Sequence, residues 1–249
     1  MFGALTSSFS GSSSGSGLLS ASTADDPPKK TPRKSSTGPP SLNTLSRVAI
    51  SLEYASLRYQ SHCPLGMYVI PFADDPFIWD AVLFIHQGYY TDSILRFRLT
   101  FPHNYPERPP TVHFITDVFH PLISHQDGTF NLAPKFNPWR PNEHHVYDVL
   151  YCIKGSFKKH TLDQIKENDC LNKEAFRYHD TTSSFAALAT QSSMLSQTAS
   201  ALFDHDYPSM ANTKGPPHSL IFHELTPEQS GALRAHLGLQ TWEDAPSSD

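Results

Sequence analysis

Apolar and polar residues recur along the chain in two rhythms, and these predict where helices and strands lie. From residue 44 to about residue 60, apolar residues recur every three or four positions, which places them on one face of a helix. These residues are Leu45, Val48, Leu52, Ala55 and Tyr59. Pro64 and Gly66 interrupt the pattern soon afterwards, so a first helix is expected to end before them.

Four short segments after this helix have the pattern of β-strands. Residues 67–71 and 79–86 are rich in aromatic and branched side chains. Between residues 95 and 101, Leu and Phe alternate with Arg96, Arg98 and Thr100, which predicts a sheet with one face in water. Residues 111–115 form the fourth strand. Because the connections are short and contain no helix, the four strands are predicted to form an antiparallel meander.

Helical spacing returns after a long segment that is rich in proline. Residues 119–141 predict a packed loop, because they combine four prolines with Phe119, Phe130, Phe136 and Trp139. A second helix follows, with Val146, Val149, Leu150, Ile153 and Phe157 on one face. A third helix is predicted from Asn172, as its cap, to about Leu202, with an apolar face of Phe185, Leu188, Leu195, Ala199 and Leu202. Helices on both sides of the meander make this an α+β domain.

The two ends of the chain differ from the middle in composition. Residues 1–43 are rich in serine and proline and are predicted to be a disordered tail. A basic cluster there, Lys29, Lys30, Arg33 and Lys34, fits either a solvated linker or a segment tuned by phosphorylation. Residues 44–203 are predicted to form the folded core. Residues 204–249 are predicted to be a partly disordered tail with a short helix from Pro227.

Composition and charge exclude several classes of protein for this chain of 249 residues. A net charge of −5 argues against nucleic acid as the main partner. The longest strongly apolar run, residues 81–85, is too short to cross a bilayer, and residues 1–10 lack the pattern of a secretory leader. Three cysteines without regular spacing favour a reducing compartment, so we expect a cytoplasmic protein.

A set of proline and aromatic motifs follows the strands in a specific order. Tyr105-Pro106 and Pro109-Pro110 precede the fourth strand, His120-Pro121 opens the long loop, and Trp139 and Pro141 close it. These prolines fix φ and remove amide donors, so the turn is expected to be rigid. We expect His120 to hold the loop through hydrogen bonds to the backbone. Over residues 45–200 this order resembles the core of ubiquitin-conjugating enzymes.

The resemblance implies an active site whose reacting groups are missing here. The family uses a cysteine thiolate to carry ubiquitin as a thioester, and an asparagine after the His-Pro pair is associated with stabilising the oxyanion. In this chain Asn131 stands at the nucleophile position and Leu122 at the asparagine position. An amide cannot form a thioester, so the resemblance implies a fold that is retained without the reaction.

Other side chains offer weaker chemistry. Cys63 is expected to lie away from the groove, Cys170 between the second and third helices, and Cys152 within the second helix as a small, partly buried residue. A zinc site would have to draw on His120, His125, His144 and His145, but the chain has no cysteine pair or helical histidine pair with the required spacing. We therefore expect neither a metal nor another cofactor.

A narrower likeness concerns the fused toes group of this family, also described as AKT-interacting proteins. Residues 53–55, 66–71, 104–106, 118–122 and 202–204 carry it, and Leu122 agrees with that group. It implies an inactive adaptor that binds a Hook-type coiled-coil protein and a large helical companion, links endosomal vesicles to dynein, and has an AKT-type kinase as a further partner. The binding face is unknown. Two alternatives stay open: a ubiquitin-binding cofactor of an active conjugating enzyme, and an active enzyme that uses Cys152.

Overall fold

The computed structural model describes residues 42–179, 181–203 and 218–239. The chain divides into two units, residues 1–39 and 40–249, and all described residues belong to the second. The predicted tail over residues 1–43 lies outside the described residues up to residue 41, and so do residues 204–217 and 240–249 of the predicted C-terminal tail. The first helix begins at Leu42, two residues earlier than predicted.

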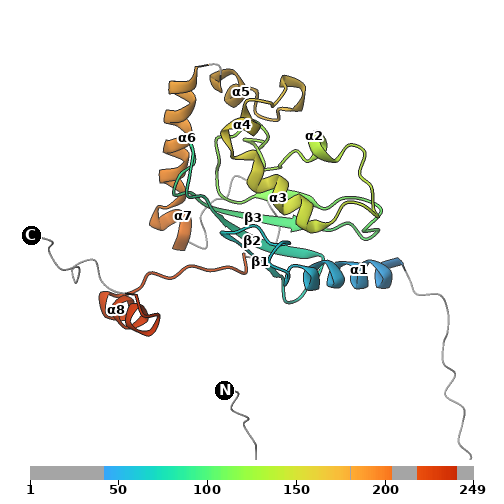
Figure 1. The fold of residues 1–249 in the computed structure, drawn as a ribbon, viewed down its shortest axis with the longest axis horizontal. Helices are drawn as coiled ribbons and strands as arrows, with labels where there is room; N and C mark the ends of the chain where they lie inside the picture. Colours follow the sequence, from blue (N-terminus) through green and yellow to red (C-terminus); the bar gives the residue numbers. More distant parts are fainter. Residues whose placement is uncertain (1–41, 180, 204–217, 240–249) are drawn as a thin grey trace, which may run out of the picture. The chain divides into compact units, whose positions relative to one another are not determined.

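The described residues form one four-stranded antiparallel sheet in which each strand pairs with the next along the chain (Figure 1). Its strands are β1 (Met67–Pro71), β2 (Ile78–Phe84), β3 (Ile94–Thr100) and β4 (Thr111–Phe114). The turn from β1 to β2 is closed where the Phe77 amide donates to Asp75 Oδ1 over 3.0 Å. The predicted meander and the α+β class are confirmed.

The main core lies between the sheet and helix α3 (Val146–Ser156). The predicted apolar face of this helix is confirmed, because Val149, Leu150 and Ile153 have no exposed surface. They belong to the same buried cluster as Leu95, Phe97 and other strand residues. At about 25 cal/mol per Å² of apolar surface, such burial is the main contribution that holds the helix to the sheet.

Helix α1 (Leu42–Ser56) presents its predicted apolar face to solvent. Leu45, Val48 and Leu52 are 52%, 54% and 66% exposed, whereas Ile50 is buried and Ala49 packs against the core. Ser46 is also buried, and its hydroxyl donates to the His103 carbonyl over 2.6 Å. An amphipathic helix normally buries its apolar stripe, so this helix has a second, uncovered face.

The proline-rich segment is a packed loop, as predicted. Thr129 of this loop forms an isolated bridge with His113 of β4, and Ile123 forms one with Phe130 within the loop. Phe130 and Phe136 are buried. The segment contains the short helix α2 (Ala133–Phe136), which the sequence did not predict. After α3 come α4 (Lys159–Leu162) and a 3₁₀ turn, η1 (Glu167–Asp169).

The predicted third helix, from Asn172 to about Leu202, is wrong in its continuity. The structure has three helices there: α5 (Lys173–His179), α6 (Thr182–Ser196) and α7 (Ala199–Phe203). Asn172 does cap the first of them, because its Oδ1 accepts from the Ala175 amide over 2.9 Å.

The packing face of α6 is partly polar, and this explains why its apolar spacing was misleading. Leu195 is 53% exposed, whereas Ser192, Ser193 and Ser196 are buried. Ser196 Oγ accepts from the Ile94 amide over 3.0 Å, and Ser192 Oγ accepts from the Phe119 amide over 3.2 Å. Buried amides require acceptors, so hydroxyl groups replace apolar side chains on this face.

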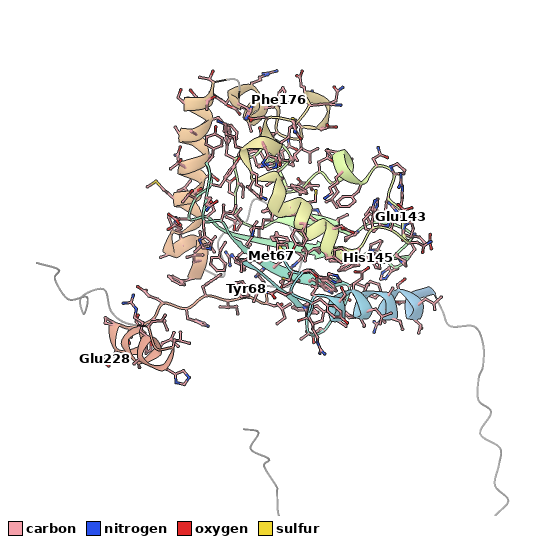
Figure 2. The ribbon with its side chains drawn as sticks, viewed as in Figure 1. Met67, Tyr68, Glu143, His145, Phe176 and Glu228 are labelled. Carbon is pink, nitrogen blue, oxygen red and sulfur yellow. The ribbon has the colours of Figure 1, made fainter. Side chains whose placement is uncertain are left out.

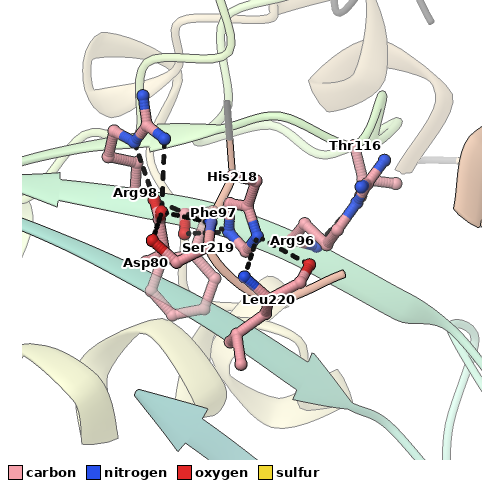
Figure 3. Close-up of polar contacts among 8 residues, drawn as sticks. All are labelled: Asp80, Arg96, Phe97, Arg98, Thr116, His218, Ser219 and Leu220. Carbon is pink, nitrogen blue, oxygen red and sulfur yellow. Dashed lines mark hydrogen bonds and ion pairs between the residues drawn. The ribbon is translucent and has the colours of Figure 1, made fainter. Parts of the chain in front are cut away.

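The prediction that one face of β3 is in water is also wrong. Arg96 and Arg98 are only 9% and 8% exposed. The guanidinium of Arg96 donates to the Ala201 carbonyl of α7, and Arg98 is paired with Asp80 of β2. Residues 218–220 lie against the same strands (Figure 3). The arginines are therefore covered by segments that lie far away in the sequence.

The helix predicted from Pro227 is confirmed as α8 (Pro227–His236). Thr226 Oγ1 accepts from the Gln229 amide and the Gln229 side chain returns to the Thr226 amide, which is a capping box. Among the residues that the structure describes, no helix combines the length and apolarity needed to cross a membrane.

Candidate functional site

A groove of about 420 Å³ lies where the resemblance places an active site. It is bounded by α2, by α3 and by the segment around α4 and η1. Its lining includes Leu122, Asn131, Lys135, Cys152 and Asp169. Leu122 and Asn131, which the resemblance assigns to the asparagine and nucleophile positions, both line this groove.

Both ends of the Asn131 amide are held by the backbone. Its Nδ2 donates to the Asp169 carbonyl over 2.8 Å, and its Oδ1 accepts from the Ala133 amide over 3.0 Å. The Asn131 main-chain amide also donates to the Leu122 carbonyl over 2.9 Å. The side chain is thus a clamp between the start of α2 and the end of η1, and an amide has no lone pair suited to nucleophilic attack.

His120 is fully buried below this groove and bridges two parts of the backbone. Its Nδ1 accepts from the Leu122 amide over 3.0 Å, and its Nε2 lies 3.1 Å from the Ser156 carbonyl at the end of α3. This arrangement requires a neutral ring with the proton on Nε2. Burial lowers the pKa of His120 to about 4, against a smaller opposing effect of the Ser156 carbonyl.

Leu122 closes the base of the groove and offers no hydrogen-bond donor from its side chain. It is 6% exposed and belongs to the main apolar cluster. Its own amide is already engaged by His120. No side-chain amide is therefore available at this position to stabilise an oxyanion.

Cys152 lines the groove itself. The sequence predicted a small, partly buried residue of the second helix, but not that it would face the groove. Burial raises the pKa of its thiol above the ordinary value, and Lys135 lowers it to a smaller extent. Cys63 and Cys170 are absent from the groove lining. Cys170 is buried with its Sγ 3.2 Å from the Lys166 carbonyl, and burial together with Asp169 and Glu167 raises its pKa to about 11.

The proline and aromatic motif forms a rigid corner beside α1. The Tyr105–Pro106 peptide bond is cis, and the Pro106 carbonyl accepts from Trp139 Nε1 over 2.8 Å. Pro110 is buried at the start of β4, next to the half-buried Pro109. Pro121 is buried too, and its carbonyl accepts from the amides of residues 171 and 172, both over 3.0 Å. Pro141 lines a second groove, on the α1 side of this corner.

Glu53 of α1 joins this corner to α3, and sequence reasoning missed it. Its Oε1 accepts from Tyr105 Oη over 2.9 Å and lies 3.0 Å from His145 Nδ1, while its Oε2 accepts from the Val146 amide over 3.1 Å. His145 stands just before α3 and faces α1 (Figure 2). The carboxylate therefore satisfies an amide at the N-terminus of α3, where negative charge is favourable.

A second polar centre lies around Asp80 of β2, which is completely buried (Figure 3). Arg98 Nε donates to Asp80 Oδ1 over 2.7 Å, and Ser219 donates to Oδ2 through its amide and its hydroxyl over 2.7 and 2.8 Å. Burial alone would raise the pKa of Asp80, but these donors and His218 lower it below its usual value. The sequence does hold a sign of this centre, because Asp80 is an acidic residue within an apolar strand and lies opposite Arg98 of the next strand.

The four histidines considered for zinc do not converge. His120 is held by the backbone, His144 accepts from the Arg140 amide, and His145 faces Glu53. His125 lies beside α6 in a small cavity with Asp117 and Gln191. Within residues 42–179, 181–203 and 218–239, no three histidine, cysteine, aspartate or glutamate side chains gather as a metal would require.

Comparison with known proteins identifies the fold. The family model for the ubiquitin-conjugating enzyme matches residues 49–192. The chain belongs to the ubiquitin-conjugating enzyme family. Among its relatives, "Protein crossbronx-like" of Drosophila mojavensis is 30% identical over 193 residues, which are 74% of this chain and 73% of that protein.

Further relatives place the chain in one group of this family. "Protein AKTIP homolog" of Nematostella vectensis is 31% identical over 73% of this chain and 57% of its own length. "AKT-interacting protein" of Danio rerio is 35% identical over 46% of this chain and 38% of its own. The resemblance to the fused toes and AKT-interacting group is thereby confirmed, and with it a ubiquitin-conjugating fold of the variant kind.

Proposed function

We propose that this protein is a catalytically inactive ubiquitin-conjugating variant that acts as a protein-binding adaptor. The observation that carries the proposal is the clamped amide of Asn131, whose nitrogen and oxygen are both engaged by the backbone. The same groove is lined by Leu122, whose side chain has no donor for an oxyanion. Such a site can hold a shape but cannot carry an activated acyl group.

Cys152 is the side chain with which an enzyme would have to work instead. It lines the groove, but burial raises the pKa of its thiol, so little thiolate forms at neutral pH. Its neighbour Lys135 is too weak an influence to reverse that direction. A thioester on Cys152 is therefore disfavoured on grounds of reactivity, and the same holds for Cys170.

The test is a charging reaction with activating enzyme, ubiquitin and ATP, analysed on a non-reducing gel. An active conjugating enzyme in the same reaction provides the positive control. We expect no ubiquitin adduct on the full chain. A thiol-sensitive adduct that disappears in the Cys152→Ser variant, but persists in Cys63→Ser, would contradict the proposal.

The partner that we propose is a Hook-type coiled-coil protein together with a large helical companion. Such an assembly would link endosomal vesicles to dynein and would keep this protein in the cytoplasm, attached to membranes through its partners. The name of the Danio rerio relative supports an AKT-type kinase as a further partner. Co-purification of the full chain with the C-terminal region of a Hook-type protein tests this step, and a failure to co-purify would remove it.

A further inference from the structure

Helix α1 carries an uncovered apolar stripe with the spacing of a coiled-coil seam. Leu45, Val48, Leu52 and Ala55 follow one another at intervals of three, four and three residues, and all four are exposed. Intervals that alternate between three and four place side chains at the a and d positions of a heptad repeat. The opposite side of α1 is occupied by the core through Ser46 and Ile50.

The stripe borders a groove that extends the uncovered surface towards α3. This groove of about 400 Å³ is lined by Leu52 and Ala49 of α1, by Tyr105 and Pro106 of the rigid corner, and by Tyr147. Its floor is fixed, because Glu53 holds Tyr105 and the start of α3 together. A narrow seam beside a preformed groove fits one α-helix laid along α1.

Charge decides which kind of helix would fit. Arg47 and Arg58 are exposed on or next to α1. Glu53, the one acidic residue between Lys29 and Arg58, is already engaged by Tyr105 and by the Val146 amide. Among the described residues 42–58, Arg47 and Arg58 are the cations and Glu53 is the one acidic residue, in a chain whose net charge is −5. Two exposed arginines beside a carboxylate that is already engaged favour acidic side chains on a helix that binds along α1.

We infer that the stripe Leu45, Val48, Leu52 and Ala55 binds an acidic amphipathic helix of a partner protein in coiled-coil geometry. Self-pairing of two α1 helices would bring the arginines of both copies together, which opposes that arrangement. A seam of two positions per heptad is also narrower than the apolar face with which helices lie on membranes. This inference rests on the adaptor function proposed above and names the surface that performs it.

Two synthetic helical peptides of three heptads provide the test. Both carry leucine at the a and d positions; one has glutamate at e and g, and the other has lysine there. We expect the full chain to bind the glutamate peptide at least tenfold more tightly than the lysine peptide, by fluorescence anisotropy. Raising the salt concentration should weaken the preferred complex, because the arginines are exposed.

A matched pair of variants separates the surface from the rest of the molecule. Leu45→Gln with Leu52→Gln preserves helix propensity and should weaken binding of the glutamate peptide at least tenfold without changing the melting temperature. Leu65→Gln, at a position 88% exposed in the loop after α1, should bind as the unaltered chain does. Arg47→Gln with Arg58→Gln should abolish the preference between the two peptides.

Several outcomes would overturn the inference. Equal affinity for the two peptides, no binding of either, or unchanged binding by the double leucine variant would each do so. Self-association, or binding to phosphatidylserine vesicles, that depends on Leu45 and Leu52 in place of peptide binding would assign the stripe to another occupant. If the leucine variant still retains the Hook-type protein, the stripe is not the binding surface, whereas the proposed adaptor function is supported. If the peptides behave as expected but the full chain does not retain the Hook-type protein, the proposed partner is wrong, whereas the binding surface is supported.

Discussion

At the scale of single residues, the buried imidazole of His120 links the stability of the fold to pH. The ring has no exposed surface, and burial lowers its pKa to about 4. The unfolded chain binds a proton near pH 6.5, whereas the folded chain does not until about pH 4. The contribution of the neutral His120 ring to the free energy of unfolding is therefore complete above pH 6.5 and is lost as the pH falls towards 4. We expect urea unfolding to report a loss of about 3 kcal/mol across this window.

The variant His120→Asn is expected to flatten this pH dependence, although it also lowers stability at pH 7. The pH dependence should become weaker because an asparagine takes up no proton in the folded or the unfolded chain. His125→Asn, on the exposed part of the loop, is the matched control and should retain the slope of the unaltered chain. A slope that persists in full in His120→Asn would show that other groups cause it.

Asp80 is the second residue whose environment leads to a prediction. The change Asp80→Ala leaves the guanidinium of Arg98 buried without its carboxylate and removes the acceptor for Ser219. Breaking a buried ion pair from one side costs about 3 to 5 kcal/mol, and we expect a loss of this size in denaturant unfolding. Glu143→Gln is the control, since the Arg140–Glu143 pair lies on the exposed surface, and its stability should not change measurably. A loss equal to that control would contradict the buried network.

At the scale of whole elements, Glu53 is the residue by which α1 fixes α3. In Glu53→Ala the Val146 amide, Tyr105 Oη and His145 lose a shared acceptor. Hydrogen bonds to a charged group contribute about 1.5 to 3 kcal/mol each, so we expect stability to fall by at least about 2 kcal/mol. Hydrogen exchange at the first turn of α3 should quicken more than exchange at its centre.

Two further variants test whether this effect belongs to the carboxylate. Glu53→Gln retains an oxygen acceptor and should lose less stability than Glu53→Ala. Ser51→Ala alters an exposed residue of the same helix, whose hydroxyl bonds only the nearby Arg47 carbonyl among the contacts described. Ser51→Ala should leave the rate of hydrogen exchange in α3 unchanged. If it raises that rate as much as Glu53→Ala does, the change results from a general disturbance of α1 and not from loss of the carboxylate.

Elements with apolar periodicity could be predicted from the sequence, and elements held by polar contacts could not. The strands and α3 follow from alternation and helical spacing, because their side chains meet one continuous apolar core. Helix α6 packs through serines, Arg96 donates to the Ala201 carbonyl, and the carboxylate that pairs with Arg98 accepts from Ser219. These contacts join residues that lie roughly a hundred positions or more apart. Periodicity contains no information about such distant partners. The same limit concealed the Asp80 and Glu53 centres.

The candidate groove could be predicted in outline from the order of its motifs. Asn131 and Leu122 both line the groove, and His120 accepts a hydrogen bond from the Leu122 amide. The clamp of Asn131 onto the Asp169 carbonyl could not be foreseen, since it depends on the path of the chain after α4. The placement of Cys152 in the groove wall depends on how α3 is rotated about its axis. Apolar spacing identifies only the face of α3 that meets the core, and not the surroundings of its other residues.

At the scale of the whole molecule, the segment after residue 217 contributes to the folded body. His218 Nε2 lies 3.3 Å from the Phe97 carbonyl, Ser219 donates twice to Asp80, and Phe222 packs edge-on against Phe84 at 6.4 Å between ring centroids. Burial lowers the pKa of His218, although Asp80 acts in the opposite direction. The boundary predicted at residue 203 therefore separates two segments that touch.

Truncation tests this conclusion directly. A chain that ends at residue 203 loses both hydrogen bonds from Ser219 to a buried carboxylate, and we expect it to be less stable than the full chain by about 2 to 4 kcal/mol. A chain that ends at residue 225 keeps this segment and removes α8, which has no buried residues, so it should retain the stability of the full chain. Denaturant unfolding of the three chains under the same conditions measures both differences. Because Asp80 is the acceptor, Ser219→Ala in the full chain should reproduce part of the loss, and equal stability of all three chains would show that residues 218–222 add nothing to the fold.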